Sequence, residues 1–181
     1  MPVLCPPTSR VRLSFLAAMA EFRAEGHGPQ PDNTRVGYEI REKGRDWADP
    51  EVFELYIEYL LDQALEDAPR PSGLVPSTDL WWIDGAEYLG SLSIRHRLTR
   101  HLLEVGGHIG YDIRPSARRR GHATAMLASA LPVVHALGID PVLITCDEDN
   151  IASRKVIEAN GGILEDRRGI KLRFWVATSP G

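Results

Sequence analysis

The chain has 181 residues, of which 43% are hydrophobic and 25% charged, as in ordinary globular proteins with a sizeable core. Its net charge of −4 argues against nonspecific DNA or RNA binding as the main activity. The sequence shows no basic secretory leader and no apolar run of the roughly 18 residues that crossing a bilayer requires. We therefore expect a cytoplasmic protein with no nucleic-acid or membrane partner.

The two cysteines, Cys5 and Cys146, lie far apart and belong to no Cys/His spacing typical of a metal site. Two lone thiols fit a reducing compartment better than a disulfide framework. We therefore expect two free cysteines and no metal ion.

Periodicity and turn signals predict the elements of the first half of the chain. Apolar residues recur close to every 3.6 positions from Val11 to Phe22, which is typical of an amphipathic helix. Asp49 followed by Pro50 is typical of a helix start. In chain order we expect a strand over residues 3–5, a helix over 9–25, a loop over 26–34, a helix from 50 through 65 and a loop over 69–77.

The second half of the chain mixes short strands with helices. Residues 80–83 and 88–94 predict a hairpin around Asp84-Gly85. Beyond it we expect a helical turn over 99–104, a strand over 105–113, a helix from near 121 to 137, a strand over 141–146, a helix over 151–160 and strands over 163–167 and 170–177. This order predicts a mixed α+β domain.

The most informative segment is the basic turn Arg118-Arg119-Arg120-Gly121-His122-Ala123, which lies between a predicted strand and a predicted helix. Backbone N–H groups at a helix start have no partner within the helix, and the helix dipole is positive there. Arginine side chains add full positive charges. The turn is therefore a candidate site for the polyphosphate of a nucleotide-like cofactor. The alternative is an ordinary solvated basic turn.

These residues resemble the GNAT superfamily of N-acetyltransferases. Its pyrophosphate motif, Gln/Arg-x-x-Gly-x-Gly/Ala, is met by Arg118, Gly121 and Ala123. The run 110–115 resembles the family's central strand, and the run 146–153 resembles the next strand with its Asn-x-x-Ser helix start. The resemblance covers roughly the last 100 residues, and the pattern is similar to bacterial acetyltransferases of this type. The first 75 residues match only in the order of their elements.

The resemblance implies a central mixed, mostly antiparallel sheet with splayed central strands, flanked by about four helices. It implies a single domain over residues 1–181, with acceptor-side helices in 1–75 and the sheet and cofactor core in 78–178. The implied co-substrate is acetyl-CoA. The residues expected to bind it are Ile113, Arg114, Arg118, Arg119, Arg120, Gly121, His122, Ala123, Thr124, Asn150 and Ser153. For Asn150 and Ser153 the alternative is a simple helix cap.

Acetyl transfer requires a base for the amine, a donor for the oxyanion and a proton for the leaving thiolate. Our candidate bases are His108 and Glu104; the alternatives are a partly buried strand histidine and a solvated acid. The resemblance places the oxyanion donor at the backbone near Ile113. The family's usual C-terminal tyrosine is absent, since no tyrosine follows Tyr111. Nothing near Cys146 marks it as an activated nucleophile.

We therefore predict an acetyl-CoA-dependent N-acetyltransferase that acts on a primary amine of a small molecule or peptide, by direct attack in a ternary complex. The alternative is a CoA-binding sensor or interaction module with the same fold and little or no activity. Acidic residues between 46 and 67 and the tryptophans at 47, 81 and 82 are candidate acceptor contacts. The pattern favours a solvated helix face for the acids and core or interface packing for the tryptophans. Phe174-Trp175-Val176 would suit a homodimer formed through a terminal strand.

Overall fold

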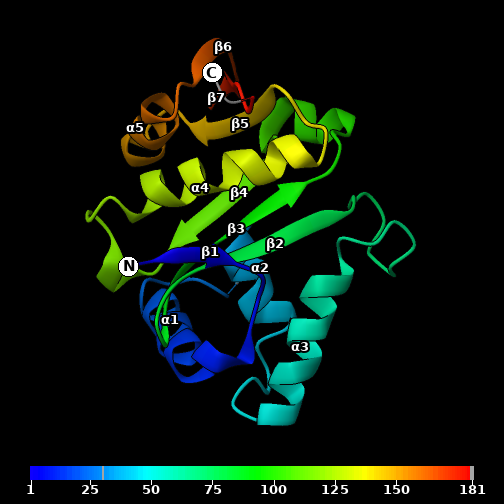
Figure 1. Ribbon diagram of the computed structural model, residues 1–181, viewed down its shortest axis with the longest axis vertical. Coiled ribbons are helices and arrows are strands. Elements are labelled where there is room, and N and C mark those ends of the chain that lie inside the picture. Colours follow the sequence, from blue (N-terminus) through cyan, green and yellow to red (C-terminus); the bar gives the residue numbers. More distant parts are fainter. Residues whose placement is uncertain (30, 180–181) are drawn as a thin grey trace.

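The computed structural model describes residues 1–29 and 31–179; Gln30, within the predicted loop over 26–34, lies outside the described residues. A sheet runs through the middle of the molecule, with helices on both faces (Figure 1). Within the described residues it has seven strands in the order β1-β2-β3-β4-β5-β7-β6. The strands are β1 (Val3–Cys5), β2 (Ser77–Asp84), β3 (Glu87–Arg95), β4 (Ile109–Ile113), β5 (Val142–Asp147), β6 (Ile163–Arg168) and β7 (Lys171–Val176).

The helices fall into two groups, one before the second strand and one after the fourth. They are α1 (Arg12–Ala24), α2 (Arg35–Glu42), α3 (Pro50–Asp62), α4 (His122–Ala136) and α5 (Ile151–Ala159), with short turns η1 (Ser9–Val11), η2 (Leu102–Gly106) and η3 (Pro115–Ala117). The predicted mixed fold is confirmed, and so is the predicted splay. All neighbouring strands pair antiparallel except β4 and β5, which are parallel and pair only at Ile109 and Ile144.

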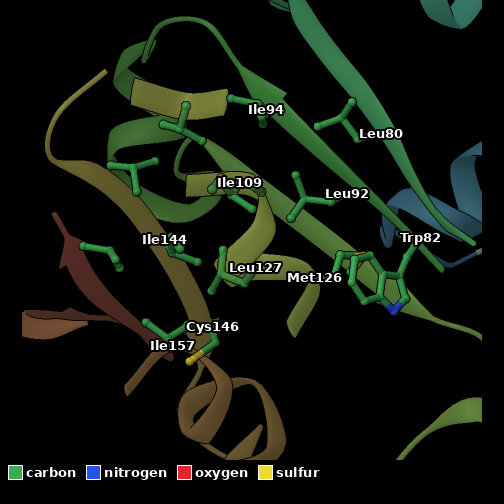
Figure 2. Packing of buried hydrophobic residues seen from close by; sticks show 14 of the residues in the cluster. Leu80, Trp82, Leu92, Ile94, Ile109, Met126, Leu127, Ile144, Cys146 and Ile157 are labelled. Carbon is green, nitrogen blue, oxygen red and sulfur yellow. The ribbon is translucent and has the colours of Figure 1, made fainter. Parts of the chain in front are cut away.

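The sheet buries both of its faces, because residues of β2 alternate between two cores. Leu80 and Trp82 belong to the core beneath α4 and α5, which Figure 2 shows from close by. Trp81 and Ile83 belong to the core beneath α1, α2 and α3. Phe15 lies at the centre of this second core, with its ring 5.0 Å from that of Trp47 and 5.1 Å from that of Trp81. The three tryptophans named as possible acceptor contacts are therefore core residues.

The boundaries differ from prediction at three places. Helix α2 was not predicted, so the described residues hold five α-helices rather than about four. Helix α3 ends at Asp62, because residues 64–68 form turns before Pro69. The start of the predicted strand over 105–113 is part of η2, a π-type turn, and the strand proper begins at Ile109.

The strand suggested for a homodimer, which contains Phe174 to Val176, is not a terminal strand. It is β7, and it pairs with β5 on one side and β6 on the other. Both of its edges are therefore occupied within the chain, and among the described strands β6 is the edge strand on this side of the sheet. Among the described helices, none is both long and apolar enough to cross a membrane.

Candidate functional site

The basic turn, residues 118–124, leads from η3 into α4. Arg119 has φ 62° and Gly121 has φ 79°, so the backbone turns sharply before the helix begins. A Cβ added to Gly121 would meet nothing within 4 Å. Within the described part of the chain, no group accepts a hydrogen bond from the backbone N–H of residues 119–124. The turn is therefore an exposed set of donors at the positive end of α4, which suits a polyphosphate.

The four predicted arginines of this region divide into two kinds. Arg119 and Arg120 are exposed and form no ion pair with any described residue, so both are free to meet an anion. Arg118 braces the turn: its Nε donates to Ile113 O at 3.1 Å, and its Nη1 pairs with Glu25 at 2.8 Å. Arg114 is buried and faces α1.

The buried side chain of Arg114 is occupied by the protein itself. It pairs with Glu21, donates to Ser14 Oγ at 3.0 Å and donates to Tyr88 O at 3.2 Å. Its backbone N–H donates to Leu89 O. The predicted cofactor contact of Arg114 has no support in this geometry, because neither its guanidinium nor its N–H is free.

The edge of β4 that faces β5 is open beyond Ile109. The backbone N–H of Arg114 points to β3, and hydrogen-bonding direction alternates along a strand. The N–H groups of Tyr111 and Ile113 therefore point toward the gap left by the splay. An extended, amide-bearing ligand arm can pair with these groups as an added strand would.

The far side of the gap is formed by the start of α5. Asn150 caps this helix, and its Oδ1 accepts a hydrogen bond from Ser153 N at 3.0 Å. The hydroxyls of Tyr111 and Ser153 lie 2.7 Å apart, so the tyrosine bridges the gap from β4 to α5. Burial raises the pKa of Tyr111 to about 12, which keeps its phenol protonated at neutral pH. Neither this pair nor its distance could be predicted from the sequence.

Three further predicted residues hold the turn to the core or begin α4. His122 Nδ1 accepts a hydrogen bond from Trp82 Nε1 at 3.3 Å. Ala123 packs against the core beneath α4, and Thr124 O accepts from Asn160 Nδ2 at 3.3 Å. Their backbone N–H groups remain available, so these three residues offer main-chain rather than side-chain contacts.

The two predicted bases lie outside the cavity described next. His108 is buried, and its Nδ1 accepts a hydrogen bond from Leu143 N at 3.0 Å. Burial is the larger cause and the positive charge of Arg95 the smaller one that together lower the pKa of His108 to about 4. Glu104 forms an ion pair with Arg168, and the hydrogen bond that Arg168 donates lowers the pKa of the Glu104 carboxyl. These contacts favour structural roles for both side chains.

A cavity of about 940 Å³ lies between the helices α2 and α3 and the open edge of β4. Tyr111, Asn150 and Ser153 line its end at the gap. The opposite end is lined by residues of α2, α3 and β2, among them Glu39, Tyr56 and Asp79. One continuous space therefore joins the gap to the helices that precede the sheet. The exposed acidic face of α3 does not line it: from this helix come Tyr56, Tyr59 and Leu60.

A charged network fixes one wall of the cavity. Arg35, at the start of α2, donates to Glu39 at 2.7 Å and to Asp112 at 2.9 Å, and it also bonds Ser91. Tyr56 donates to the other oxygen of Glu39 at 3.3 Å. Burial raises the pKa of Glu39, although the charge of Arg35 opposes this. The network holds α2 against β3 and β4 along this wall of the cavity.

A row of three residues, one from each of β2, β3 and β4, crosses the floor of the cavity. In the register of the sheet, Asp79 on β2 lies opposite Ser93 on β3, and Ser93 lies opposite Gly110 on β4. All three face α1, α2 and α3, as Trp81 does two positions after Asp79. Arg95, in the same wall, donates to the carbonyls of Gly106 and Gly107 at 3.1 Å and so anchors the end of η2.

Sequence reasoning missed Arg35, Glu39 and Asp79. A carboxylate in an otherwise buried strand was the available signal for Asp79. Cys146 lines the gap, and it packs against the core near Ile157 of α5 (Figure 2). Burial raises the pKa of its thiol, so the geometry adds no support for a covalent acyl intermediate on this residue.

A donor-rich turn at a helix start, an open strand edge and an adjoining cavity suit an extended, phosphate-bearing cofactor that binds beside a second substrate. The family model described as "Acetyltransferase (GNAT) domain" matches residues 30–163. The chain belongs to the GNAT acetyltransferase family. The predicted class of enzyme, an N-acetyltransferase with acetyl-CoA as co-substrate, is confirmed.

Solved structures agree with this fold at low sequence identity. RimJ of Mycobacterium smegmatis, in complex with CoA-disulfide, has a TM-score of 0.65 and 18% identity over 97% of this chain and 81% of its own. The ribosomal-protein-S5-alanine acetyltransferase of Vibrio fischeri has a TM-score of 0.65 and 13% identity over 98% of this chain and 93% of its own. The PaiA N-acetyltransferase of Thermoplasma acidophilum, in complex with coenzyme A, has a TM-score of 0.59 and 13% identity over 98% of this chain and 99% of its own. No curated protein sequence matches the chain.

Proposed function

We propose that the protein transfers the acetyl group of acetyl-CoA to a primary amine by direct attack in a ternary complex. The observation that carries the proposal is the open edge of β4, which joins the donor-rich turn over residues 119–124 to the cavity of about 940 Å³. A cofactor laid along this edge reaches the acceptor with its acyl end. Both substrates can then be held at once, which direct transfer requires.

The pyrophosphate is proposed to bind the N–H groups of residues 119–124. Arg119 and Arg120, which are exposed, would add charge-assisted hydrogen bonds. The pantetheine arm would pair with the N–H groups of Tyr111 and Ile113 that face the gap. The same N–H groups would stabilise the oxyanion of the tetrahedral intermediate. Asn150 and Ser153 would contact the arm from the other side of the gap.

The leaving thiolate requires a proton, and the pair formed by Tyr111 and Ser153 is proposed to supply it. Their hydroxyls lie 2.7 Å apart at the end of the cavity where the open strand edge begins. Because Tyr111 remains protonated at neutral pH, its hydroxyl is a donor. This pair would take the role that a C-terminal tyrosine plays in the family, although it comes from β4 and α5.

The acceptor is proposed to be a small molecule or a peptide with a free amine. The cavity wall carries both signs of charge, with Arg35 and Arg95 beside Glu39, Asp79 and Asp112. A wall of mixed charge accepts a cationic amine that also carries polar or anionic groups, as a peptide N-terminus does. Among the solved structures of similar fold, one is named a ribosomal-protein-S5-alanine acetyltransferase and another a ribosomal L7/L12 α-N-protein acetyltransferase.

The test is steady-state release of CoA with a panel of amines that includes peptides and small amines. Turnover that depends on both acetyl-CoA and one class of acceptor supports the proposal. The alternative, a CoA-binding sensor module, predicts calorimetric binding of acetyl-CoA with no acceptor-dependent CoA release. Absence of binding to the wild-type protein would remove both functions.

A further inference from the structure

The base for the acceptor's amine is not assigned by the site described so far, because His108 and Glu104 lie outside the cavity. Four carboxylates of the described residues line the cavity. Glu39 and Asp112 are both bound to Arg35, and Asp147 pairs with Lys171 at 2.6 Å. Within the described residues, Asp79 has no cation within 4 Å. Of these four described carboxylates, Asp79 is therefore the one that no ion pair neutralises, and its side chain has a hydrogen bond with Ser93.

The floor of the cavity leads from Asp79 to the open edge of β4. Ser93 and Gly110 are the next residues in the same row, so small groups separate the carboxylate from the acyl site. A Cβ on Gly110 would have only the guanidinium of Arg95 as a neighbour, at 3.5 Å. Two strand spacings place the Cα atoms of Asp79 and Gly110 about 10 Å apart. That separation suits proton transfer through solvent above Ser93.

We propose that Asp79 is the group that accepts the proton lost by the acceptor's amine, through water above Ser93 and Gly110. This inference rests on the proposed function and names a residue for its first step. It differs from the sequence-based choice of His108 and Glu104. It also places the base on β2, with the acyl group across β3 at the edge of β4.

The step balances as follows. An ammonium, R–NH₃⁺, gives one proton to the Asp79 carboxylate and becomes a neutral amine. The nitrogen lone pair forms the C–N bond with the thioester carbonyl carbon, and the C–S bond breaks with its electron pair on sulfur. The sulfur takes a proton from the hydroxyl pair of Tyr111 and Ser153, which gives the CoA thiol, and the second proton of the nitrogen restores that pair. Asp79 then returns its proton to solvent.

The surroundings of Asp79 suit this task. Arg35 and Glu39 face it from α2, Arg95 faces it from β3, and Tyr56 and Tyr59 face it from α3. Burial raises the pKa of Asp79 to about 7, and the charge of Glu39 adds to the rise, while the charge of Arg35, the hydrogen bond from Ser93 and the charge of Arg95 oppose it. A base is most effective when its pKa lies near the working pH.

The first experiment compares Asp79→Asn with Asp84→Asn, a change at the exposed end of the same strand. Acetyl-CoA and the fastest acceptor of the amine panel serve as substrates. Loss of a general base typically costs about 100-fold or more, so Asp79→Asn is expected to lower kcat/KM by on the order of 10²-fold at pH 7. It should leave the calorimetric Kd for acetyl-CoA unchanged. Asp84→Asn should match the wild type.

The pH profile separates this role from a structural one. In the wild type, kcat/KM is expected to decrease as the pH falls below about 7, and we call this decrease the acid limb of the profile. The acid limb should be missing in Asp79→Asn. The kcat/KM of this variant should rise again at high pH, where the amine is already deprotonated. Unchanged kcat/KM in Asp79→Asn would overturn the inference while leaving the proposed function intact. Wild-type protein that binds acetyl-CoA but acetylates no amine would overturn both.

A second measurement covers the case in which Asp79→Asn fails to fold. Two acceptors whose amine pKa values differ by more than one unit are compared on the wild type and on Asp79→Glu, which keeps a carboxyl group. An acid limb of kcat/KM that lies at the same pH for both acceptors supports Asp79 as the base. A limb that moves with the pKa of the acceptor shows that the amine arrives already deprotonated, and this overturns the inference.

Discussion

Glu21 of α1 accepts two hydrogen bonds from Ser116, one from its backbone N–H and one from its hydroxyl, each at 2.9 Å. Ser116 belongs to η3, which lies between the end of β4 and the basic turn. The same carboxylate pairs with the buried guanidinium of Arg114. One residue of the first helix thus fixes the end of the strand that is proposed to pair with pantetheine and the entry to the turn that is proposed to bind pyrophosphate.

Glu21→Gln is therefore expected to affect both stability and cofactor binding. It leaves buried Arg114 with only the exposed carboxylate of Glu87, 3.7 Å away, as an anionic partner, which we expect to cost about 2–3 kcal/mol in the free energy of unfolding. The looser turn should weaken acetyl-CoA binding about 3–10-fold, since a preformed site loses less entropy on binding. Urea unfolding and calorimetry measure the two effects. Glu25→Gln, which affects only the exposed pair with Arg118, should cost under about 1 kcal/mol.

The same carboxylate gives a pH dependence with a definite sign. Burial opposes ionisation of Glu21, but the hydrogen bonds from Arg114 and Ser116 outweigh it and lower the pKa below 4.5. A lowered folded-state pKa stabilises the protein above the unfolded value, and this stabilisation is lost as the pH falls through the folded value. Wild type should therefore lose stability below about pH 4.5 more steeply than Glu21→Gln. Parallel unfolding curves for the two proteins across this range would contradict the assignment.

Gly121 tests the anion-binding turn, and α4 provides its own control. Gly121 precedes the helix with φ 79°, and Gly138 follows it with φ 77°; a Cβ at either meets nothing within 4 Å. Tryptophan at either position should cost a similar amount of stability, about 1–2 kcal/mol, because both require a left-handed backbone. Only Gly121→Trp covers the free N–H groups. It should abolish micromolar binding of acetyl-CoA in calorimetry, while Gly138→Trp binds as the wild type does.

The proposed proton donor gives a prediction of a different kind. Tyr111→Phe removes the hydroxyl that lies 2.7 Å from Ser153, and we expect kcat to fall on the order of 10²-fold with little change in the Kd of acetyl-CoA. Ser153→Ala should have a similar effect if the two hydroxyls act together, so the double variant should be no slower than either single one. Additive losses in stopped-flow measurements of CoA release would show that the residues act separately.

The sequence predicted most of the fold because the relevant signals are local. Asp49 and Pro50 start α3 as predicted, and the glycine-bearing turn at Gly121 starts α4. Helix α2 was not predicted because it has only eight residues and few apolar ones, with Val36 and Ile40 as its buried side chains. Its cap was the one usable signal, since Thr34 accepts a hydrogen bond from Gly37 N.

The site was harder to predict because its contacts join distant parts of the chain. Arg114 resembled a cofactor ligand from its place beside the motif, yet its partner Glu21 lies 93 positions away. Arg35 and Asp112 are 77 positions apart. Local patterns located the main-chain donors of the turn, which depend only on a helix start. They could not show which charged side chains the tertiary structure had already paired.

His108 provides the last prediction. If it were the base, as the sequence suggested, it would affect the pH dependence of kcat/KM, whereas its contacts in the structure imply an effect on the pH dependence of stability. Its Nδ1 accepts a hydrogen bond from Leu143 N, and burial lowers its pKa from 6.5 to about 4. Between these values the unfolded chain binds a proton that the folded protein does not, so the stability falls as the pH decreases from 6.5 toward 4. The loss should reach about 2–3 kcal/mol.

His108→Asn offers a side-chain oxygen close to the position of Nδ1 and does not titrate. It should fold, and its stability between pH 6.5 and 4 should decline less than that of the wild type, as measured by urea unfolding at several pH values. Its kcat/KM should keep the limb near pH 7, because that limb is attributed to Asp79. If the limb disappears in His108→Asn while the stability profile is unchanged, His108 is the base and the structural interpretation fails.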